Sequence, residues 1–302
     1  MCRIAPIRRS RSGQLCTHEG NTIGGVEQTS PVTVYLARME LEGKVVVITG
    51  GGGGIGSALG RRFAAEGARG VVLADIDQSA AEAAAAAIGA RARGVACDAA
   101  DSNAVAAMVD EVERREGPID LFCSNAGIAR GLDVDATDEQ WNEMWRVNVM
   151  SAVIAARHMV PRWTERQGGY LMITASAAGL LSTLGDAGYS ATKHASVGLA
   201  EWIAITYGDR GIKVSCLCPQ GVRTNMVFGP GTEGTLGAEQ VRRLGVIEPE
   251  ELAESVVRGL REEHFLILPH PEVATYFRNK AENHDRWLGG MRKLQRQLGT
   301  KS

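Results

Sequence analysis

The sequence has 302 residues, of which 44% are hydrophobic and 23% are charged, and its formal net charge is −2. This composition suits a globular chain with a sizeable core, and it argues against a nucleic-acid partner, whose surface would need clustered Lys and Arg. No apolar run approaches the roughly 20 residues that span a bilayer, so we expect no membrane partner. The six cysteines include no C-x-x-C pair, so we expect buried free thiols, no metal site and a reducing, cytoplasmic location.

Residues 1–38 differ from the rest of the chain. They show no sustained hydrophobic periodicity, and Pro6, Arg8 and Arg9 interrupt the apolar centre that a secretory signal needs. An organelle transit peptide is an alternative, because acidic residues are scarce before Glu19. We favour a disordered or non-native N-terminal extension, with the native chain starting at Met39.

From residue 44 onward, short apolar runs alternate with longer segments of helical periodicity. We predict strands at 44–49, 70–75, 92–96, 119–124, 170–174, 213–218 and 265–268. We predict helices at about 55–66, 79–88, 102–115, 138–163, 189–207 and 249–262. Ser79 is expected to cap the second helix, Thr137 and Gln140 form a capping box for the fourth, and Pro249 opens the last. This alternation predicts an α/β fold with a doubly wound parallel sheet and helices on both faces, in one domain at 39–270.

A run of glycines lies between the first predicted strand and the first predicted helix. Gly50, Gly54, Ile55 and Gly56 stand where a Rossmann-type fold turns tightly and presents a helix N-terminus to a pyrophosphate. A phosphate-binding loop of the nucleotide triphosphatase type is excluded, because Gly56 is followed by Ser57 rather than Lys. The position of the run therefore predicts dinucleotide binding.

Two aspartates follow the second and third predicted strands. Asp75 stands where a carboxylate binds the ribose hydroxyls of NAD and repels the additional phosphate of NADP. The glycine run contains no Arg or Lys to bind that phosphate, so we expect NAD rather than NADP. Asp98 is either an acceptor for the adenine amino group or a solvated turn residue.

A tyrosine and a lysine share one face of the predicted helix 189–207. Tyr189 and Lys193 are four residues apart, a spacing that is more typical of an ordinary amphipathic helix when it occurs alone. A tyrosine with a pKa of ~10 works as a base near neutral pH at a cost of about 3–4 kcal/mol. An ammonium about 4 Å away returns roughly 4 kcal/mol at an effective dielectric constant of about 20. Lys193 is therefore sufficient to make Tyr189 a proton shuttle, with the Ser176 hydroxyl holding the substrate oxygen.

With these residues placed, the chain resembles the short-chain dehydrogenase/reductase family from about residue 39 to residue 268. The residues that carry the resemblance are Thr49, Gly50, Gly54, Ile55, Gly56, Asp98, Asn125, Ala126, Gly127, Asn148, Ser176, Tyr189 and Lys193. Ser176 and Tyr189 are separated by 13 positions (189 − 176 = 13), which is the usual separation in the family. The resemblance implies an NAD(P)-dependent oxidoreductase that acts on a small-molecule alcohol or ketone.

The same resemblance implies a role for each site residue. Tyr189 is the general acid/base, Lys193 lowers its pKa and binds the nicotinamide ribose, and Ser176 positions the substrate oxygen. Asn148 holds a water in the proton relay. Further cofactor contacts are implied at Asn125, Ala126, Gly127, Pro219, Val222 and Thr224. The family usually forms homodimers or homotetramers through helices that correspond to 138–163 and 189–207, and we expect such an assembly here.

The chain departs from the family pattern where the substrate binds. Ser124 replaces the first of two asparagines, and Gln220 is inserted after Pro219 as either a substrate contact or a brace for its loop. Met226 and Phe228 begin a segment that forms a mobile lid in the family. They either indicate a substrate with hydrophobic bulk or pack the lid down. Residues 271–302 are predicted to form one or two amphipathic helices that pack on the domain or on a neighbouring subunit.

Two other classes of protein are alternatives to an enzyme of this family. A non-catalytic NAD-binding or scaffold protein on the same fold is the alternative. The complete set of Asn148, Ser176, Tyr189 and Lys193 favours the enzyme. A serine hydrolase is disfavoured because the sequence has no G-x-S-x-G motif.

Overall fold

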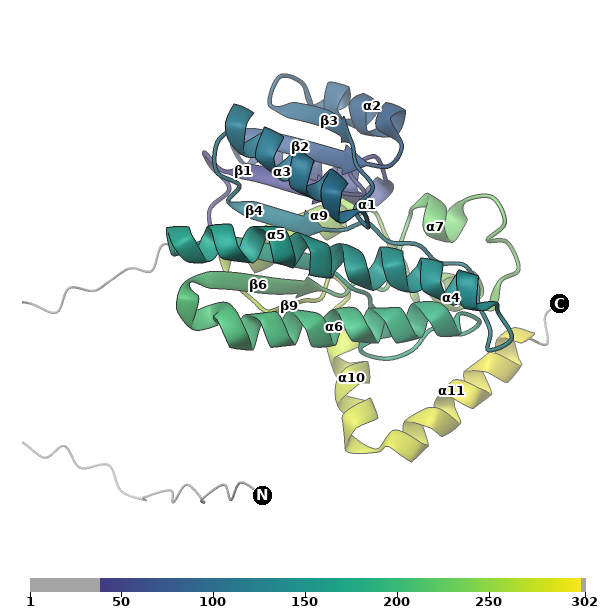
Figure 1. Ribbon diagram of the computed structural model, residues 1–302. Helices are drawn as coiled ribbons and strands as arrows, with labels where there is room; N and C mark the ends of the chain where they lie inside the picture. The colour runs from purple at the N-terminus through teal and green to yellow at the C-terminus, as the bar shows by residue number, and fades with distance from the viewer. Residues whose placement is uncertain (1–38, 300–302) are drawn as a thin grey trace, which may run out of the picture. The chain divides into compact units, whose positions relative to one another are not determined.

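The computed structural model describes residues 39–299, all of which fall within one compact unit (Figure 1). The hypotheses about residues 1–38 lie outside the described residues.

The described chain is built on a parallel sheet of seven strands in the order β3-β2-β1-β4-β5-β6-β9. The strands are β1 (Val45–Thr49), β2 (Gly70–Asp75), β3 (Ala92–Ala96), β4 (Leu121–Ser124), β5 (Gly169–Thr174), β6 (Ile212–Leu217) and β9 (Leu266–Ile267). The order reverses between β1 and β4, and the crevice at the carboxyl ends of these strands is where ligands bind in such sheets. The predicted fold class is confirmed.

Helices cover both faces of the sheet because its strands are apolar on both sides (Figure 1). Successive side chains of a strand point to opposite faces, so Val45 and Val47 enter one core while Val46 and Ile48 enter the other. The first core is covered by α3 (Ser102–Arg115), α5 (Ser151–Arg166) and α6 (Ala187–Tyr207). The second core is covered by α1 (Gly54–Ala65), α2 (Gln78–Ile88) and α9 (Pro249–Arg261).

The ends of the helices mostly agree with the sequence signals, with two corrections. The capping box of Thr137 and Gln140 opens α4 (Asp138–Trp145), and Pro249 is the first residue of α9. Asp77, rather than Ser79, caps α2, because its carboxylate reaches the Ala80 N–H at 3.1 Å. The predicted helix 138–163 is divided into α4 and α5 by a π-helical segment, η1 (Arg146–Met150).

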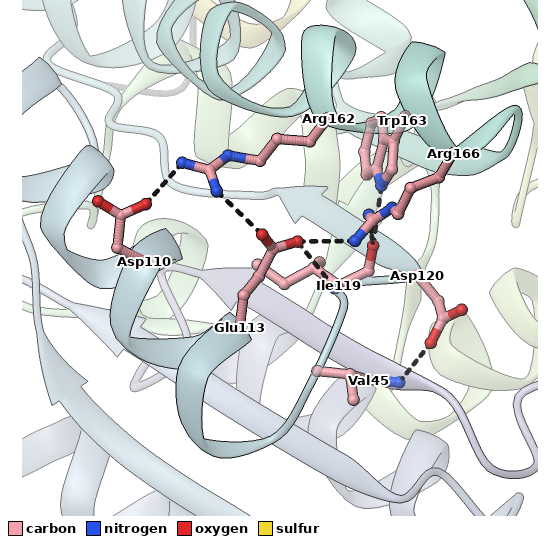
Figure 2. A network of polar contacts seen from close by, with 8 residues as sticks. All are labelled: Val45, Asp110, Glu113, Ile119, Asp120, Arg162, Trp163 and Arg166. Atoms are coloured by element: carbon pink, nitrogen blue, oxygen red, sulfur yellow. Dashed lines mark hydrogen bonds and ion pairs between the residues drawn. The ribbon is translucent and has the colours of Figure 1, made fainter.

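A cluster of ion pairs joins α3 to α5 (Figure 2). The Arg162 guanidinium contacts Asp110 at 2.6 Å and Glu113 at 2.9 Å. Arg166 contacts the second oxygen of Glu113 at 2.9 Å and donates to the Ile119 carbonyl at 2.9 Å. These contacts fix α5 against the segment that enters β4. We call Asp110, Glu113, Arg162 and Arg166 the α3–α5 ion cluster.

Two further groups of elements follow β6. The short strands β7 (Gly221–Val222) and β8 (Val246–Ile247) pair with each other, and between them the chain forms α7 (Asn225–Phe228) and α8 (Leu236–Leu244). After β9 the chain forms α10 (Glu272–Glu282) and α11 (His284–Gly299), as predicted for the C-terminal segment. Within residues 39–299, no helix is both long and apolar enough to span a bilayer.

Candidate active site

The glycine turn between β1 and α1 has the geometry that a bound pyrophosphate needs. Gly50 has a φ of +66°, which only glycine adopts without strain. A Cβ added at Gly56 would lie 2.1 Å from the Gly50 carbonyl oxygen, so any side chain there would disrupt the turn. Gly54 and Ile55 begin α1 and line the main cavity. The turn therefore exposes a helix N-terminus to an anion without obstruction by side chains.

Asp75 lies at the end of β2, beside the glycine turn. Its carboxylate accepts one N–H from Gly52 at 3.0 Å and one from Asp77 at 3.1 Å. Each oxygen keeps a second lone pair, and the residue lines the same cavity. The turn and this carboxylate together fit the pyrophosphate and the ribose hydroxyls of a dinucleotide.

Asp98 lies in an ion pair at the wall of the same cavity. It accepts from Arg146 at 2.8 Å and from the Ala100 N–H at 2.9 Å. Partial burial raises the pKa of Asp98, but the hydrogen bonds from Arg146 and Ala100 outweigh it and hold that pKa below its usual value. Asp98 is thus held as an ionised acceptor by its own neighbours.

Asn125 joins the ends of β1 and β5 at the floor of the cavity. Its side-chain amide donates to the Thr49 carbonyl at 3.1 Å and its oxygen accepts from the Thr174 hydroxyl at 3.1 Å. The Thr49 hydroxyl in turn accepts the N–H groups of Asn125 and Ala126 at 3.0 and 3.2 Å. Sequence reasoning missed the role of Thr49 in this junction and missed Thr174 altogether. The only available signal was that each is a hydroxyl residue at the end of a buried strand.

The three proposed catalytic side chains converge on this floor. Ser176 follows β5, and its hydroxyl accepts the Ala178 N–H at 3.1 Å. Tyr189 and Lys193 occupy successive turns of α6, with the Lys193 Nζ 5.5 Å from the centre of the Tyr189 ring. Lys193 donates to the Thr174 carbonyl at 2.9 Å. All three residues line one cavity together with the glycine turn.

Burial is the main influence on the pKa values of both members of the pair. Burial raises the pKa of Tyr189, the nearby Asp186 carboxylate raises it further, and a hydrogen bond from Ser176 opposes the rise. Burial also lowers the pKa of Lys193 to about 8. Burial of the phenol therefore outweighs the opposing hydrogen bond. The lowering of the Tyr189 pKa by Lys193 stays a prediction.

Asn148 braces the site rather than facing the cavity. Its side-chain oxygen accepts the Ile128 N–H at 2.8 Å, and its amide donates to the Ile128 carbonyl at 3.0 Å and to the Thr192 hydroxyl at 3.1 Å. The residue lies in η1, and π-helical segments of this kind are frequent at functional sites. The predicted contact of Asn148 with a relay water stays a prediction. Gly127 packs close by, since a Cβ there would lie 3.2 Å from the Lys193 Nζ.

Asp186 is a positioning residue that sequence reasoning did not identify. Its buried carboxylate caps α6 by accepting the Tyr189 N–H at 2.8 Å, and it also accepts the N–H groups of Arg130 and Gly131 at 3.0 and 2.8 Å. It thereby fixes the start of the tyrosine helix against the 128–132 loop. An aspartate three residues before a helical tyrosine was the available N-cap signal.

The loop after β6 is held by a buried histidine that sequence reasoning also missed. His270 accepts the Gln220 N–H at Nδ1, at 3.2 Å, and its Nε2 lies 3.0 Å from the Gly221 carbonyl. These partners select the neutral tautomer with its proton on Nε2. The Gln220 side chain donates to the Leu244 carbonyl at 3.4 Å while lining the cavity. Gln220 thus braces its loop, and a substrate contact remains compatible with its place.

The remaining predicted site residues divide between the cavity and its surroundings. Those that line the cavity, beyond the residues already placed there, are Ala126, Gly127, Pro219, Val222, Thr224 and Met226. Phe228 is not among the lining residues, because its ring lies against the guanidinium groups of Arg223 and Arg242 at 4.9 and 5.3 Å. The cavity volume is about 1410 Å³, which exceeds the roughly 300–1,000 Å³ of ordinary ligand sites. There is room for both a dinucleotide and a substrate.

Comparisons with known proteins agree with this geometry. The family model for short chain dehydrogenases matches residues 44–230. Meso-2,3-butanediol dehydrogenase of Serratia marcescens is 36% identical over 71% of this chain and 86% of its own length. 1-Deoxy-11-beta-hydroxypentalenate dehydrogenase of Streptomyces exfoliatus is 31% identical over 81% of this chain and 90% of its own length. Sex determination protein tasselseed-2 of Zea mays is 38% identical over 64% of this chain, and the match spans only 60% of that protein.

A solved structure gives the same result. The crystal structure of a short-chain dehydrogenase/reductase from Burkholderia phymatum in complex with NAD superimposes with a TM-score of 0.73 at 29% identity, covering 82% of this chain and 96% of that one. These matches account for the glycine turn, the doubly wound sheet and the cluster of Ser176, Tyr189 and Lys193. The chain belongs to the short-chain dehydrogenase/reductase family, and it is an oxidoreductase of that type.

Proposed function

We propose that this oxidoreductase is an NAD-dependent dehydrogenase that acts on a secondary alcohol, or the matching ketone, with some hydrophobic bulk. Tyr189 is the general acid/base. The observation that carries the proposal is that Ser176, Tyr189 and Lys193 line one continuous cavity with the glycine turn and Asp75. The two relatives named as dehydrogenases of a butanediol and of a hydroxypentalenate support an alcohol substrate.

The chain's own residues divide the proton chemistry between them. The Ser176 hydroxyl holds the substrate oxygen near the Tyr189 phenol, which takes the hydroxyl proton during oxidation and returns it during reduction. The Thr174 carbonyl fixes Lys193, whose charge favours the phenolate form. When bound, the nicotinamide would supply the hydride acceptor or donor.

The preference for NAD is argued from charge. The pyrophosphate would bind at the glycine turn and the ribose hydroxyls at Asp75, whose negative charge would repel an additional phosphate. Arg146 lines the same cavity, but its guanidinium already contacts Asp98 at 2.8 Å. Neither an Arg nor a Lys occurs within residues 49–56.

A panel of secondary alcohols and ketones with each cofactor tests this proposal. We expect NADH formation from at least one alcohol, with kcat/KM at least tenfold higher with NAD than with NADP. Binding of NAD without turnover on any member would favour the alternative, a scaffold protein on the same fold. Turnover that prefers NADP would remove Asp75 from its proposed role.

We also propose a homodimer or homotetramer in a cytoplasmic setting. The exposed face of α6 supports the assembly, since Trp202 and Ile205 are 56% and 82% exposed. Four described cysteines are buried free thiols, which suits a reducing compartment. Light scattering of the purified protein measures the assembly, and a monomeric mass would contradict it.

A further inference from the structure

The helix α11 turns its apolar stripe toward the candidate active site. Trp287, Gly290, Met291 and Leu294 all line the same cavity as Tyr189. Their spacing of i, i+3, i+4 and i+7 places them on one face of the helix. Leu288 is absent from the lining and is 43% exposed. The stripe thus faces the cavity.

Further apolar residues line the same cavity, beside polar ones such as Gln240 and Arg286. Five aliphatic residues from the segment after Ser176 and from the region of α7 and α8 line it: Leu181, Leu184, Val227, Val241 and Leu244. Trp287 and Leu294 are seven positions apart (294 − 287 = 7), so the stripe runs for about 10 Å at ~1.5 Å per residue. A ligand beside this stripe would contact apolar side chains over about 10 Å.

A partly buried contact attaches this pair of helices to the segment that follows Ser176. The Lys280 ammonium, on α10, donates to the carbonyls of Leu180 and Leu181 at 2.8 and 3.1 Å. The same ammonium lies 4.9 Å from the centre of the Trp287 ring. Lys280 therefore links α10, α11 and the segment after the catalytic serine through one side chain.

We propose that α10 and α11 form the outer wall of the substrate site and select secondary alcohols on an apolar skeleton about 10 Å long, the length of the α11 stripe. Trp287, Gly290, Met291 and Leu294 determine this specificity, and Lys280 is the positioning residue that holds the wall in place. The proposal rests on the proposed function, because it concerns the substrate of the same site.

Two adjacent glycines of α11 provide a matched pair of variants. A Cβ added at Gly289 or at Gly290 meets no atom within 4 Å, but only Gly290 lines the cavity. Replacing a glycine within a helix improves helix propensity by up to about 1 kcal/mol, so neither Gly289→Phe nor Gly290→Phe should impair folding. Only the second puts a ring into the proposed substrate space.

The two variants are compared with wild type on cyclohexanol and on a steroid that carries one secondary alcohol. We expect wild type to prefer the steroid, and Gly290→Phe to lower the steroid-to-cyclohexanol ratio of kcat/KM by tenfold or more, while Gly289→Phe keeps the wild-type ratio. Equal ratios for the two variants, or a wild-type preference for cyclohexanol, would overturn the specificity proposal. Absence of turnover on every alcohol would instead contradict the proposed function.

Lys280→Met tests the positioning role separately. We expect a several-fold rise in the KM for the steroid with a smaller change in kcat, because the wall loosens while the proton-transfer residues stay in place. Lys213→Met is the control, since Lys213 lies near the start of β6 in a half-exposed ion pair with Glu263, and neither residue lines the cavity. A loss in kcat alone, or the same KM change in both variants, would contradict this role for Lys280.

Discussion

The α3–α5 ion cluster and the catalytic lysine differ in whether a carboxylate compensates the positive charge. Arg162 contacts two carboxylates (Figure 2). Although burial lowers its pKa, the hydrogen bonds that it donates to Asp110 and Glu113 raise that pKa above its ordinary value. Lys193 is buried, forms no ion pair with any residue in 39–299, and has its pKa lowered to about 8. The positive charge of Arg162, which joins two helices, is therefore compensated by carboxylates. The positive charge of Lys193, beside the Tyr189 phenol, has no such partner and is free to stabilise a phenolate.

Among substitutions in the two regions, we expect the largest effect to be the loss of activity when Lys193 is replaced. We expect Lys193→Met to lower kcat/KM for alcohol oxidation by about 100-fold or more, because the phenolate loses its cation. The melting temperature should not fall, because a costly buried charge has been removed. Initial rates and thermal unfolding measure the two effects. Wild-type activity in this variant, or a large drop in melting temperature with activity lost in proportion, would contradict the comparison.

The pH dependence of the free energy of unfolding is a second test of the uncompensated charge on Lys193. The unfolded chain keeps the Lys193 proton up to the ordinary lysine pKa, whereas the folded protein loses it at about 8. Between these values the unfolded state binds more protons, so stability rises with pH, by an amount on the order of 3 kcal/mol at most. We expect this rise in the free energy of unfolding in wild type, relative to Lys193→Met, when denaturant unfolding is measured from about pH 7.5 to about pH 10. Parallel curves for the two proteins would contradict it.

Asp75 is a second charge that has no ion-pair partner among the described residues, since it accepts only backbone N–H groups. We expect Asp75→Ala to narrow the NAD-to-NADP ratio of kcat/KM by about tenfold, because the repulsion of the additional phosphate is lost. Steady-state kinetics with both cofactors measure the ratio. An unchanged ratio would show that the carboxylate does not contact the ribose.

The smallest effect is expected in the compensated region. Glu113→Gln weakens the contacts to Arg162 and Arg166, and we expect a loss of about 1 kcal/mol in the free energy of unfolding. Activity should stay at the wild-type level, because the cluster lies outside the cavity lining. Denaturant unfolding and NADH formation check both parts. A fall in kcat without a loss of stability would link the cluster to the chemistry.

The two regions also differ in what could be predicted from the sequence. Most of the strands were predictable because they are short, largely apolar runs, of which β1 is the clearest example. The helix α3 agrees with its predicted range of 102–115. The Tyr189–Lys193 pair and the glycine turn were predictable because their spacing within one element determines their geometry.

The supports of the site depend instead on contacts between distant segments. His270 reaches Gln220 across 50 positions, and Asp186 reaches Arg130 across 56. No local pattern in the sequence reports such pairs. The same holds for α11, whose amphipathic character was predicted but whose stripe faces a cavity that forms only when α8 and α10 are in place.

The most direct test of the proton-transfer role is the rate of NADH formation by Tyr189→Phe, measured together with its affinity for NAD. The substitution removes one hydroxyl and keeps the ring, so NAD binding should be unchanged while the rate falls by a factor of about 100 to 10,000. A wild-type rate with normal NAD binding would show that another group carries the proton.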